Sequence, residues 1–191
     1  MIPDLQDSTQ PARRLNNIVL VGLMGSGKTT VGKLVAQSIG FNFVDTDDVI
    51  TRAAGKSIPD IFSEEGEAGF RVHETNALRQ LMNEQQCVIA TGGGIVTQPH
   101  NLPLLKELGY VVWLFATPEI LHARTAHSDE RPLLRNNDPA GTLRSLLNAR
   151  APLYQQACDL KITTDDLSVH DVAYGLAESV RVAFAQQKPA S

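Results

Sequence analysis

The sequence predicts a three-layer α/β fold in which helices cover both faces of a five-stranded parallel sheet. Three observations support this prediction. Short apolar runs recur along the 191 residues, and an amphipathic segment of helical periodicity follows each of them. The composition, 42% hydrophobic and 20% charged, is ordinary for a globular protein. With no repeat or linker visible, residues 1–191 are expected to form a single domain.

The elements are expected to alternate along the chain. Apolar runs predict strands at residues 16–22, 41–47, 87–91, 110–116 and 160–164. Helical periodicity predicts helices at residues 27–40, 47–55, 58–62, 65–85, 99–109, 117–127, 136–154 and 168–186. Ser57 and Ser168 are expected to cap helix N-termini, and Gly40 and Gly55 to end helices.

Three polar segments are expected to lie outside these elements. Residues 1–15 and 187–191 are typical of a flexible lead and tail, and the lead has no apolar stretch of the kind found in a secretory signal. Residues 127–138 form a longer polar connection between two helices and predict a mobile lid. No apolar run is long enough to predict a membrane span.

The charge pattern points to a small anionic ligand. The net charge of −4 argues against a broad nucleic-acid surface. Arginines nevertheless gather between residues 124 and 150, in a stretch without lysine. They are Arg124, Arg131, Arg135, Arg144 and Arg150. Their planar guanidinium groups suit phosphate and carboxylate, although a solvated helix face with charge pairs is the alternative interpretation.

The clearest chemical signal is a phosphate-binding loop. The stretch GLMGSGKT, residues 22–29, matches G-x-x-x-x-G-K-[ST] and lies between a predicted strand and a predicted helix. Its glycines allow backbone N–H groups to surround phosphates, Lys28 adds a positive charge, and Thr29 offers a hydroxyl to Mg²⁺. The expected ATP contacts in this segment are Gly25, Ser26, Gly27, Lys28, Thr29 and Thr30. A glycine-rich turn with a chance lysine is the alternative.

Two carboxylates follow the second predicted strand, in the stretch VDTDD. Asp45 and Asp47 would project to the same side if the strand continued through both of them. One could then hold the waters of Mg²⁺ while the other accepts a proton from an attacking hydroxyl. In the alternative interpretation, Asp47 or Asp48 only caps the following helix.

Three consecutive glycines, Gly92, Gly93 and Gly94, follow the third predicted strand. They indicate either a loose turn or a place where another group must approach the backbone closely. The strand before them ends at the same predicted sheet edge as the phosphate loop and the two carboxylates. Close approach of a small polar ligand is therefore the favoured interpretation.

Taken together, these segments make the chain resemble the shikimate kinases, small P-loop kinases of the nucleoside-monophosphate-kinase-like group. The resemblance runs from about Asn17 to the last helix, and its parts are GLMGSGKTTVGK, FVDTD, SIPDIFSEEGEAGFRVHE, ATGGGIV, RPLL and RAPLY. It implies transfer of the γ-phosphoryl group of ATP to the 3-hydroxyl of shikimate. It also implies the strand order 2-3-1-4-5, a helical substrate-binding region at residues 47–83, and a lid.

The resemblance also implies roles for individual residues. On the substrate side, Asp47 would bind the hydroxyls and serve as the candidate base. Arg71, oriented by Glu74, and Arg150 would clamp the carboxylate, beside the loop of Gly92, Gly93 and Gly94. On the nucleotide side, Arg124 would lie against adenine, Arg131 would reach the phosphates from the lid, and Asp45 would act with Thr29 on Mg²⁺ through water. The implied catalytic group is Asp47, Lys28 and Arg131.

Some alternatives stay open from the residues alone. Arg71 could be a surface arginine whose stem covers apolar atoms, and Arg150 could be a stabilising cation near a helix C-terminus. A kinase for gluconate or a nucleoside monophosphate is the nearest rival function, and a nucleotide-dependent switch is a rival of another class. The expected setting is a cytoplasmic monomer that binds ATP and shikimate, with no nucleic-acid or membrane partner. The presence of two cysteines without a disulfide pattern agrees with a reducing compartment.

Overall fold

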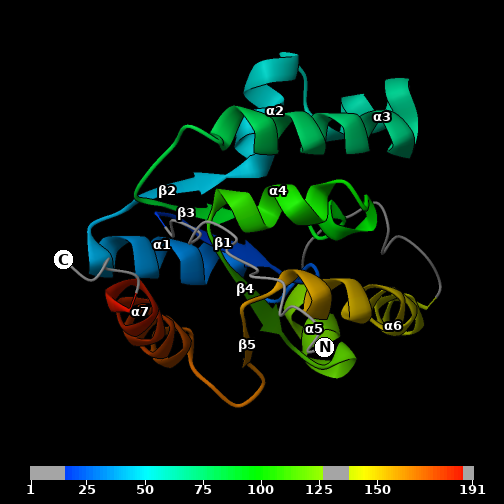
Figure 1. Cartoon of the computed structure of the whole chain (residues 1–191). Coiled ribbons are helices and arrows are strands. Elements are labelled where there is room, and N and C mark those ends of the chain that lie inside the picture. Colours follow the sequence, from blue (N-terminus) through cyan, green and yellow to red (C-terminus); the bar gives the residue numbers. More distant parts are fainter. Residues whose placement is uncertain (1–15, 127–137, 187–191) are drawn as a thin grey trace, which may run out of the picture.

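The computed structural model describes residues 16–126 and 138–186. Its centre is a five-stranded parallel sheet of order β2-β3-β1-β4-β5, with helices on both faces (Figure 1). The strands are β1 Ile18–Val21, β2 Asn42–Asp45, β3 Cys87–Ala90, β4 Tyr110–Phe115 and β5 Leu160–Thr163. The predicted fold class and strand order are therefore confirmed.

Helices occupy most of the chain between the strands. They are α1 Lys28–Ile39, α2 Thr46–Ala54, α3 Ile58–Leu81, α4 Asn101–Leu108, α5 Pro118–Thr125, α6 Pro139–Ala157 and α7 Val169–Ala185, with a short 3₁₀ turn η1 at Ile95–Thr97. Among the described residues, no helix is both long and apolar enough to cross a bilayer. The predicted lead and tail, and all of the predicted lid except Asp138, lie outside the described residues.

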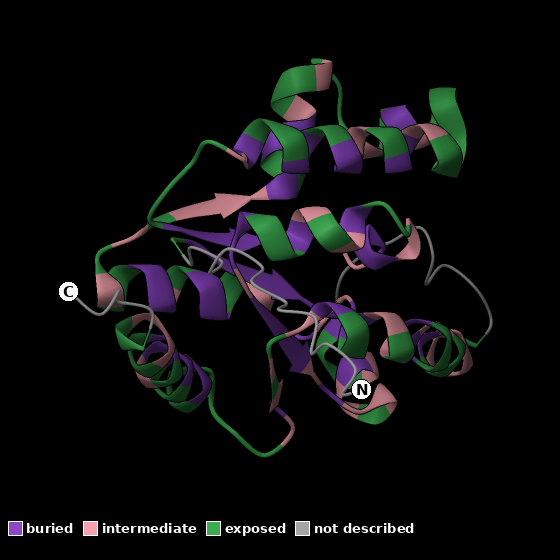
Figure 2. Ribbon diagram, in the orientation of Figure 1, coloured by how far each residue is buried: buried purple, intermediate pink, exposed green. Residues whose placement is uncertain are grey.

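Each face of the sheet carries its own hydrophobic core, because successive side chains of a strand point to opposite faces. Ile18 and Leu20 of β1 pack in a cluster with α1 and α7. Val19 and Val21 pack on the other face, in a larger cluster with α3, α4 and α6. Burial on both faces explains why the central strands are continuous apolar runs, which Figure 2 shows as buried ribbon.

The predicted helix boundaries are partly confirmed. The Ser57 and Ser168 hydroxyls accept hydrogen bonds from the N–H groups of Asp60 and Asp171, at 3.3 and 3.1 Å. Gly40 and Gly55 follow α1 and α2 with φ of 75° and 65°, a left-handed conformation that glycine adopts without steric cost.

Two predicted boundaries are wrong. The second strand ends at Asp45, because the Asp45 carboxylate accepts a hydrogen bond from the Asp47 N–H at 3.1 Å and starts α2 there. Asp47 and Asp48 therefore lie in the first helical turn, and neither is the cap. The helix predicted at 65–85 ends at Leu81, four residues early. The break predicted between the segments 58–62 and 65–85 is present within α3, as a kink at the non-helical residue Gly66, with φ 70° and ψ −174°.

One side chain joins the start of β3 to the loop before it and to the end of α4. Asn17 is 2% exposed, and its amide donates to the backbone carbonyls of Glu84 and Leu108 at 2.8 and 2.9 Å. Its side-chain oxygen accepts from the Cys87 N–H at 3.0 Å. Three backbone groups from three segments thus depend on one buried amide.

Replacing this amide should destabilise the whole domain. Asn17→Ala removes three hydrogen bonds and leaves buried backbone groups without partners, so we expect a loss of about 3 kcal/mol in the free energy of unfolding. Urea unfolding of the variant measures this loss. Asn148→Ala, at an exposed position of α6, is the control and should change the stability by less than about 0.5 kcal/mol. Equal effects at both positions would contradict the role of Asn17.

Candidate active site

The chemically active segments meet at the edge where the parallel strands end. The phosphate loop follows β1, Asp45 ends β2, the glycine run follows β3, and Thr164 follows β5. They line a cavity of about 470 Å³, together with Lys28, Asp47 and Arg124. This edge is the usual ligand position in open α/β sheets.

The phosphate loop has the backbone that its sequence predicts. Gly22, Gly25 and Gly27 have φ of 145°, 81° and 92°, which side-chain-bearing residues rarely adopt. The Lys28 ammonium donates to the carbonyls of Gly22 and Leu23 at 2.8 and 3.0 Å, so it lies over the loop. The loop is thus a positively charged cradle at the N-terminus of α1, suited to a phosphate chain.

Two side chains with oxygen atoms that can bind a metal ion lie next to each other at the N-terminus of α1. The Thr29 hydroxyl donates to a carboxylate oxygen of Asp45 at 2.9 Å. Elsewhere in the described ranges, no group of three His, Cys, Asp or Glu side chains gathers to hold a metal. One hydroxyl and one carboxylate beside a phosphate cradle fit Mg²⁺, which usually binds few protein oxygens and completes its shell with water and phosphate.

The glycine run is a packed loop. None of its three residues has φ in the left-handed region, so backbone conformation does not require glycine there. A Cβ at Gly92 would lie 2.4 Å from a carboxylate oxygen of Glu74, and one at Gly94 would lie 2.1 Å from the Arg71 guanidinium. A Cβ at Gly93 would lie 3.4 Å from the backbone of the phosphate loop. The first groups to approach this backbone are therefore the protein's own side chains.

Arg71 and Glu74 form a buried ion pair beside that loop. Arg71 donates to Glu74 at 2.7 Å and to Glu67 at 2.6 Å, and the exposed fractions of the Arg71 and Glu74 residues are 7% and 0%. Burial raises the pKa of the Glu74 carboxyl, and the Arg71 charge opposes this shift. Burial lowers the pKa of Arg71, but the two glutamates outweigh it and raise that pKa. Arg71 is thus a buried cation that two glutamates hold in place. The alternative interpretation, in which it is a surface arginine, is wrong.

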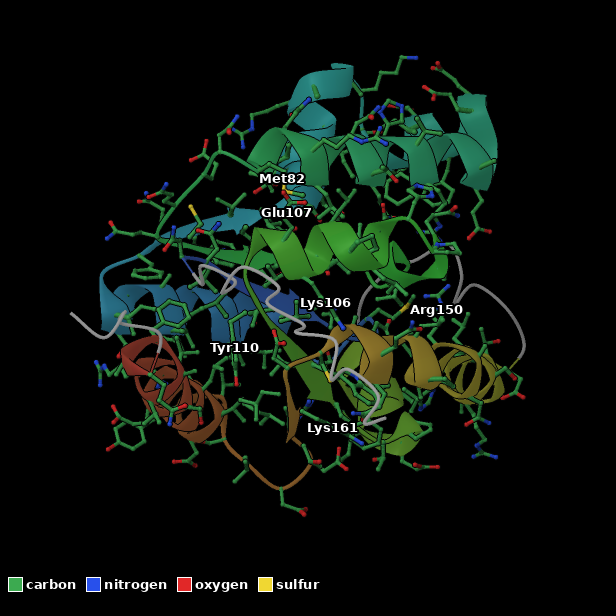
Figure 3. All side chains as sticks on the ribbon, in the orientation of Figure 1. Met82, Lys106, Glu107, Tyr110, Arg150 and Lys161 are labelled. Carbon is green, nitrogen blue, oxygen red and sulfur yellow. The ribbon has the colours of Figure 1, made fainter. Side chains whose placement is uncertain are left out.

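Hydrogen bonds fix the glycine loop from both sides. The Gly92 N–H donates to the Thr46 hydroxyl at 3.2 Å, from the start of α2. The Gly93 carbonyl accepts from Arg150 at 3.2 Å and from the Tyr154 hydroxyl at 2.5 Å, both on α6. Figure 3 shows Arg150 projecting from this helix. Because α6 continues to Ala157, Arg150 lies before the last turn, and the helix-end alternative for it is wrong.

Sequence reasoning gave no role to Thr46 or Tyr154, although both lie inside motifs that it singled out. Thr46 is the central residue of the DTD stretch, and Tyr154 ends RAPLY. The available signals were the position of Thr46 between two aspartates and that of Tyr154 one helical turn after Arg150. Both residues are fully buried, and each binds a backbone group of the glycine loop.

The arginine-rich segment separates into different environments. Arg124 donates to the hydroxyl and carbonyl of Thr164 at 2.9 and 2.7 Å and lines the cavity. Arg144 is exposed and pairs with Glu119 at 3.4 Å, as a solvated helix face would. Arg131 and Arg135 lie outside the described residues. The prediction of one anion-binding cluster therefore holds at most for part of the segment.

The remaining site residues form two adjoining groups. The cavity is lined by the phosphate loop, Thr30, Asp45, Asp47, Gly92, Gly93 and Arg124. Arg71, Glu74 and Arg150 contact the glycine loop at Gly94, Gly92 and Gly93, respectively. Asp47 links the two groups, because a Cβ at Gly92 would lie 3.7 Å from its carboxylate and 2.4 Å from that of Glu74.

Comparisons with known proteins agree with this geometry. The family model described as "Shikimate kinase" matches residues 24–181. A shikimate kinase of Trichormus variabilis is 53% identical over 146 residues, which cover 76% of this chain and 80% of that protein. One from Symbiobacterium thermophilum is 47% identical over 167 residues, covering 86% and 96%.

Solved structures give the same result. The shikimate kinase from Acinetobacter baumannii in complex with shikimate has a TM-score of 0.84 and 42% identity, covering 90% of this chain and 96% of that one. A gluconokinase from Sinorhizobium meliloti, with a TM-score of 0.55 and 16% identity, shares the fold alone. The phosphate loop and the carboxylate and arginine groups beside it agree with these matches. The chain therefore belongs to the shikimate kinase family.

Proposed function

We propose that this kinase transfers the γ-phosphoryl group of ATP to the 3-hydroxyl of shikimate, giving shikimate 3-phosphate and ADP. One observation carries the proposal: a phosphate cradle faces a carboxylate, Asp47, behind which two buried arginines border the same glycine loop. Shikimate has one carboxylate and three hydroxyls. A site that binds it must therefore offer cations to the carboxylate and hydrogen-bond acceptors to the hydroxyls. The relative solved with shikimate supports this ligand.

On the nucleotide side, the phosphates bind to the backbone of residues 25–27 and to the N-terminus of α1. Lys28, Thr29 and Thr30 line the same part of the cavity and also contact the phosphates. Arg124 lines the cavity, held by Thr164, and by resemblance it would lie against the adenine base. Thr29 and Asp45 would hold Mg²⁺, Asp45 through water, and when bound the ion would neutralise charge on the phosphates. By resemblance, Arg131 adds a further positive charge from the lid.

On the substrate side, Arg71 and Arg150 bind the shikimate carboxylate as charge-assisted donors. Glu74 holds one edge of the Arg71 guanidinium and so orients it. Gly92, Gly93 and Gly94 bring the loop backbone close to the ring. Asp47 then accepts the proton of the 3-hydroxyl, or orients that hydroxyl, as the oxygen attacks the γ-phosphorus in line. We further propose that the enzyme works as a cytoplasmic monomer.

A substrate panel tests the proposed function directly. ADP release by the full chain with ATP and Mg²⁺ should depend on shikimate, because its carboxylate and hydroxyls suit the two arginines and Asp47 and the chain belongs to the shikimate kinase family. Gluconate and nucleoside monophosphates, tested at the same concentrations, should give release no faster than ATP alone. Faster release with gluconate would transfer the assignment to that rival kinase.

Asp47 should contribute to the chemical step. We expect Asp47→Asn to lower kcat at saturating shikimate by roughly 10²–10⁴, the range for loss of a general base. The coupled ADP assay measures this. Asp48→Asn is the matched control, since Asp48 is the exposed neighbour in the same helical turn and should keep kcat within about twofold. An unchanged kcat in Asp47→Asn would remove Asp47 from the mechanism.

The Arg150 side chain should contribute to the affinity for shikimate and not to the affinity for ATP. We expect Arg150→Ala to raise the KM for shikimate about thirtyfold or more, which corresponds to at least about 2 kcal/mol for a buried charge pair. The KM for ATP should stay within about twofold. Arg144→Ala removes an exposed arginine of the same helix and should change neither constant. A shikimate KM that does not move would refute the clamp.

A further inference from the structure

The hydroxyl of Tyr154 is aimed at the backbone of the substrate loop. Tyr154 is fully buried on α6, and its hydroxyl donates to the Gly93 carbonyl at 2.5 Å. Arg150, one turn earlier on the same helix, donates to the same oxygen at 3.2 Å. A carbonyl oxygen has two lone pairs, so these two donors together satisfy it.

Packing holds the Tyr154 ring in place. Its ring stacks on Trp113 of β4, with 5.5 Å between ring centroids and an interplanar angle of 29°. Burial raises the pKa of the Tyr154 phenol well above its ordinary value, so the hydroxyl keeps its proton and stays a donor. The donor is therefore held by packing against the sheet, independently of its bond to the loop.

Fixing the Gly93 carbonyl fixes more than one atom. The peptide unit is planar, so in a trans peptide the Gly94 N–H points opposite to the Gly93 carbonyl. Three glycines in a row would otherwise leave this segment unusually free to rotate. The Tyr154 hydroxyl occupies one lone pair of the Gly93 carbonyl oxygen. A single N–H group of Arg150 is then enough to satisfy the other lone pair, although the guanidinium has five N–H groups.

We infer that Tyr154 is a positioning residue for shikimate, acting through the Gly93–Gly94 peptide and through Arg150 without touching the substrate. This inference rests on the proposed function, because it assumes that the glycine loop and Arg150 bind shikimate. It assigns the tyrosine of RAPLY to substrate affinity. We expect the main effect on the affinity for shikimate, because the phosphate loop and the Arg124–Thr164 contact make no hydrogen bond to Tyr154 among the described residues, although Gly93 itself borders the phosphate loop.

Tyr154→Phe tests the inference, since it removes only the hydroxyl. We expect the KM for shikimate to rise about tenfold, the effect of leaving a buried acceptor with one weaker partner. The KM for ATP should stay within about twofold, and kcat should fall less than the affinity for shikimate. Tyr174→Phe removes the hydroxyl of an exposed tyrosine on α7 and should leave both constants unchanged.

Two results would overturn the inference. A folded Tyr154→Phe enzyme whose shikimate KM stays within twofold of the parent would show that the hydroxyl does not position the substrate. Equal rises in the KM values for shikimate and ATP would assign Tyr154 to the general integrity of the fold. Either result, obtained while the parent chain phosphorylates shikimate, leaves the proposed function intact. A parent chain inactive on shikimate would instead refute the proposed function.

A second measurement does not depend on the folding of Tyr154→Phe. The chain has three tyrosines, so the full protein can be labelled with 3-fluorotyrosine and followed by ¹⁹F NMR. Tyr110→Phe and Tyr174→Phe each remove one signal, which leaves that of residue 154 assigned. Shikimate should shift this signal, and ATP alone should not. A signal that is indifferent to shikimate, or equally sensitive to ATP, would overturn the inference.

Discussion

The buried pairing of Arg71 with Glu74 is the constraint around which the substrate side of this protein is built. A buried charge is tolerated only when it is paired and hydrogen-bonded, and the pair here is 2.7 Å apart. It fits only because Gly92 and Gly94 have no side chains where the carboxylate and guanidinium lie. The glycine run, the part of α3 that carries Arg71 and Glu74, and the start of α2 therefore form one interdependent arrangement.

The same sheet edge serves two ligands by different means. On the nucleotide side, left-handed glycines shape a backbone cradle and Lys28 closes over it. On the proposed substrate side, the glycines have ordinary conformations, and side chains from α2, α3 and α6 contact the loop. The strands set the distance between the two sides, so two ligands can be aligned with little further loss of conformational freedom in the protein.

Much of this architecture could be predicted from local pattern. The strand–helix alternation and the phosphate loop follow from periodicity and from glycine and lysine spacing, whereas the strand order came from the family resemblance. The end of β2 was mispredicted because Asp45, two residues before the expected end, caps α2 with its side chain. The burial of Arg71 and the roles of Thr46 and Tyr154 could not be predicted from local pattern, because each depends on the glycine loop, which is far away in the sequence.

The stacking of Tyr154 on Trp113 has an optical consequence. Trp113 is the single tryptophan of the chain, and the ammonium of Lys161, labelled in Figure 3, lies 4.4 Å from the centre of its ring. All tryptophan emission from this protein therefore originates at one buried indole, between a cation and a ring that touches the glycine loop. The molecule carries a built-in fluorophore one side chain away from its substrate loop, and no label has to be introduced to observe that region.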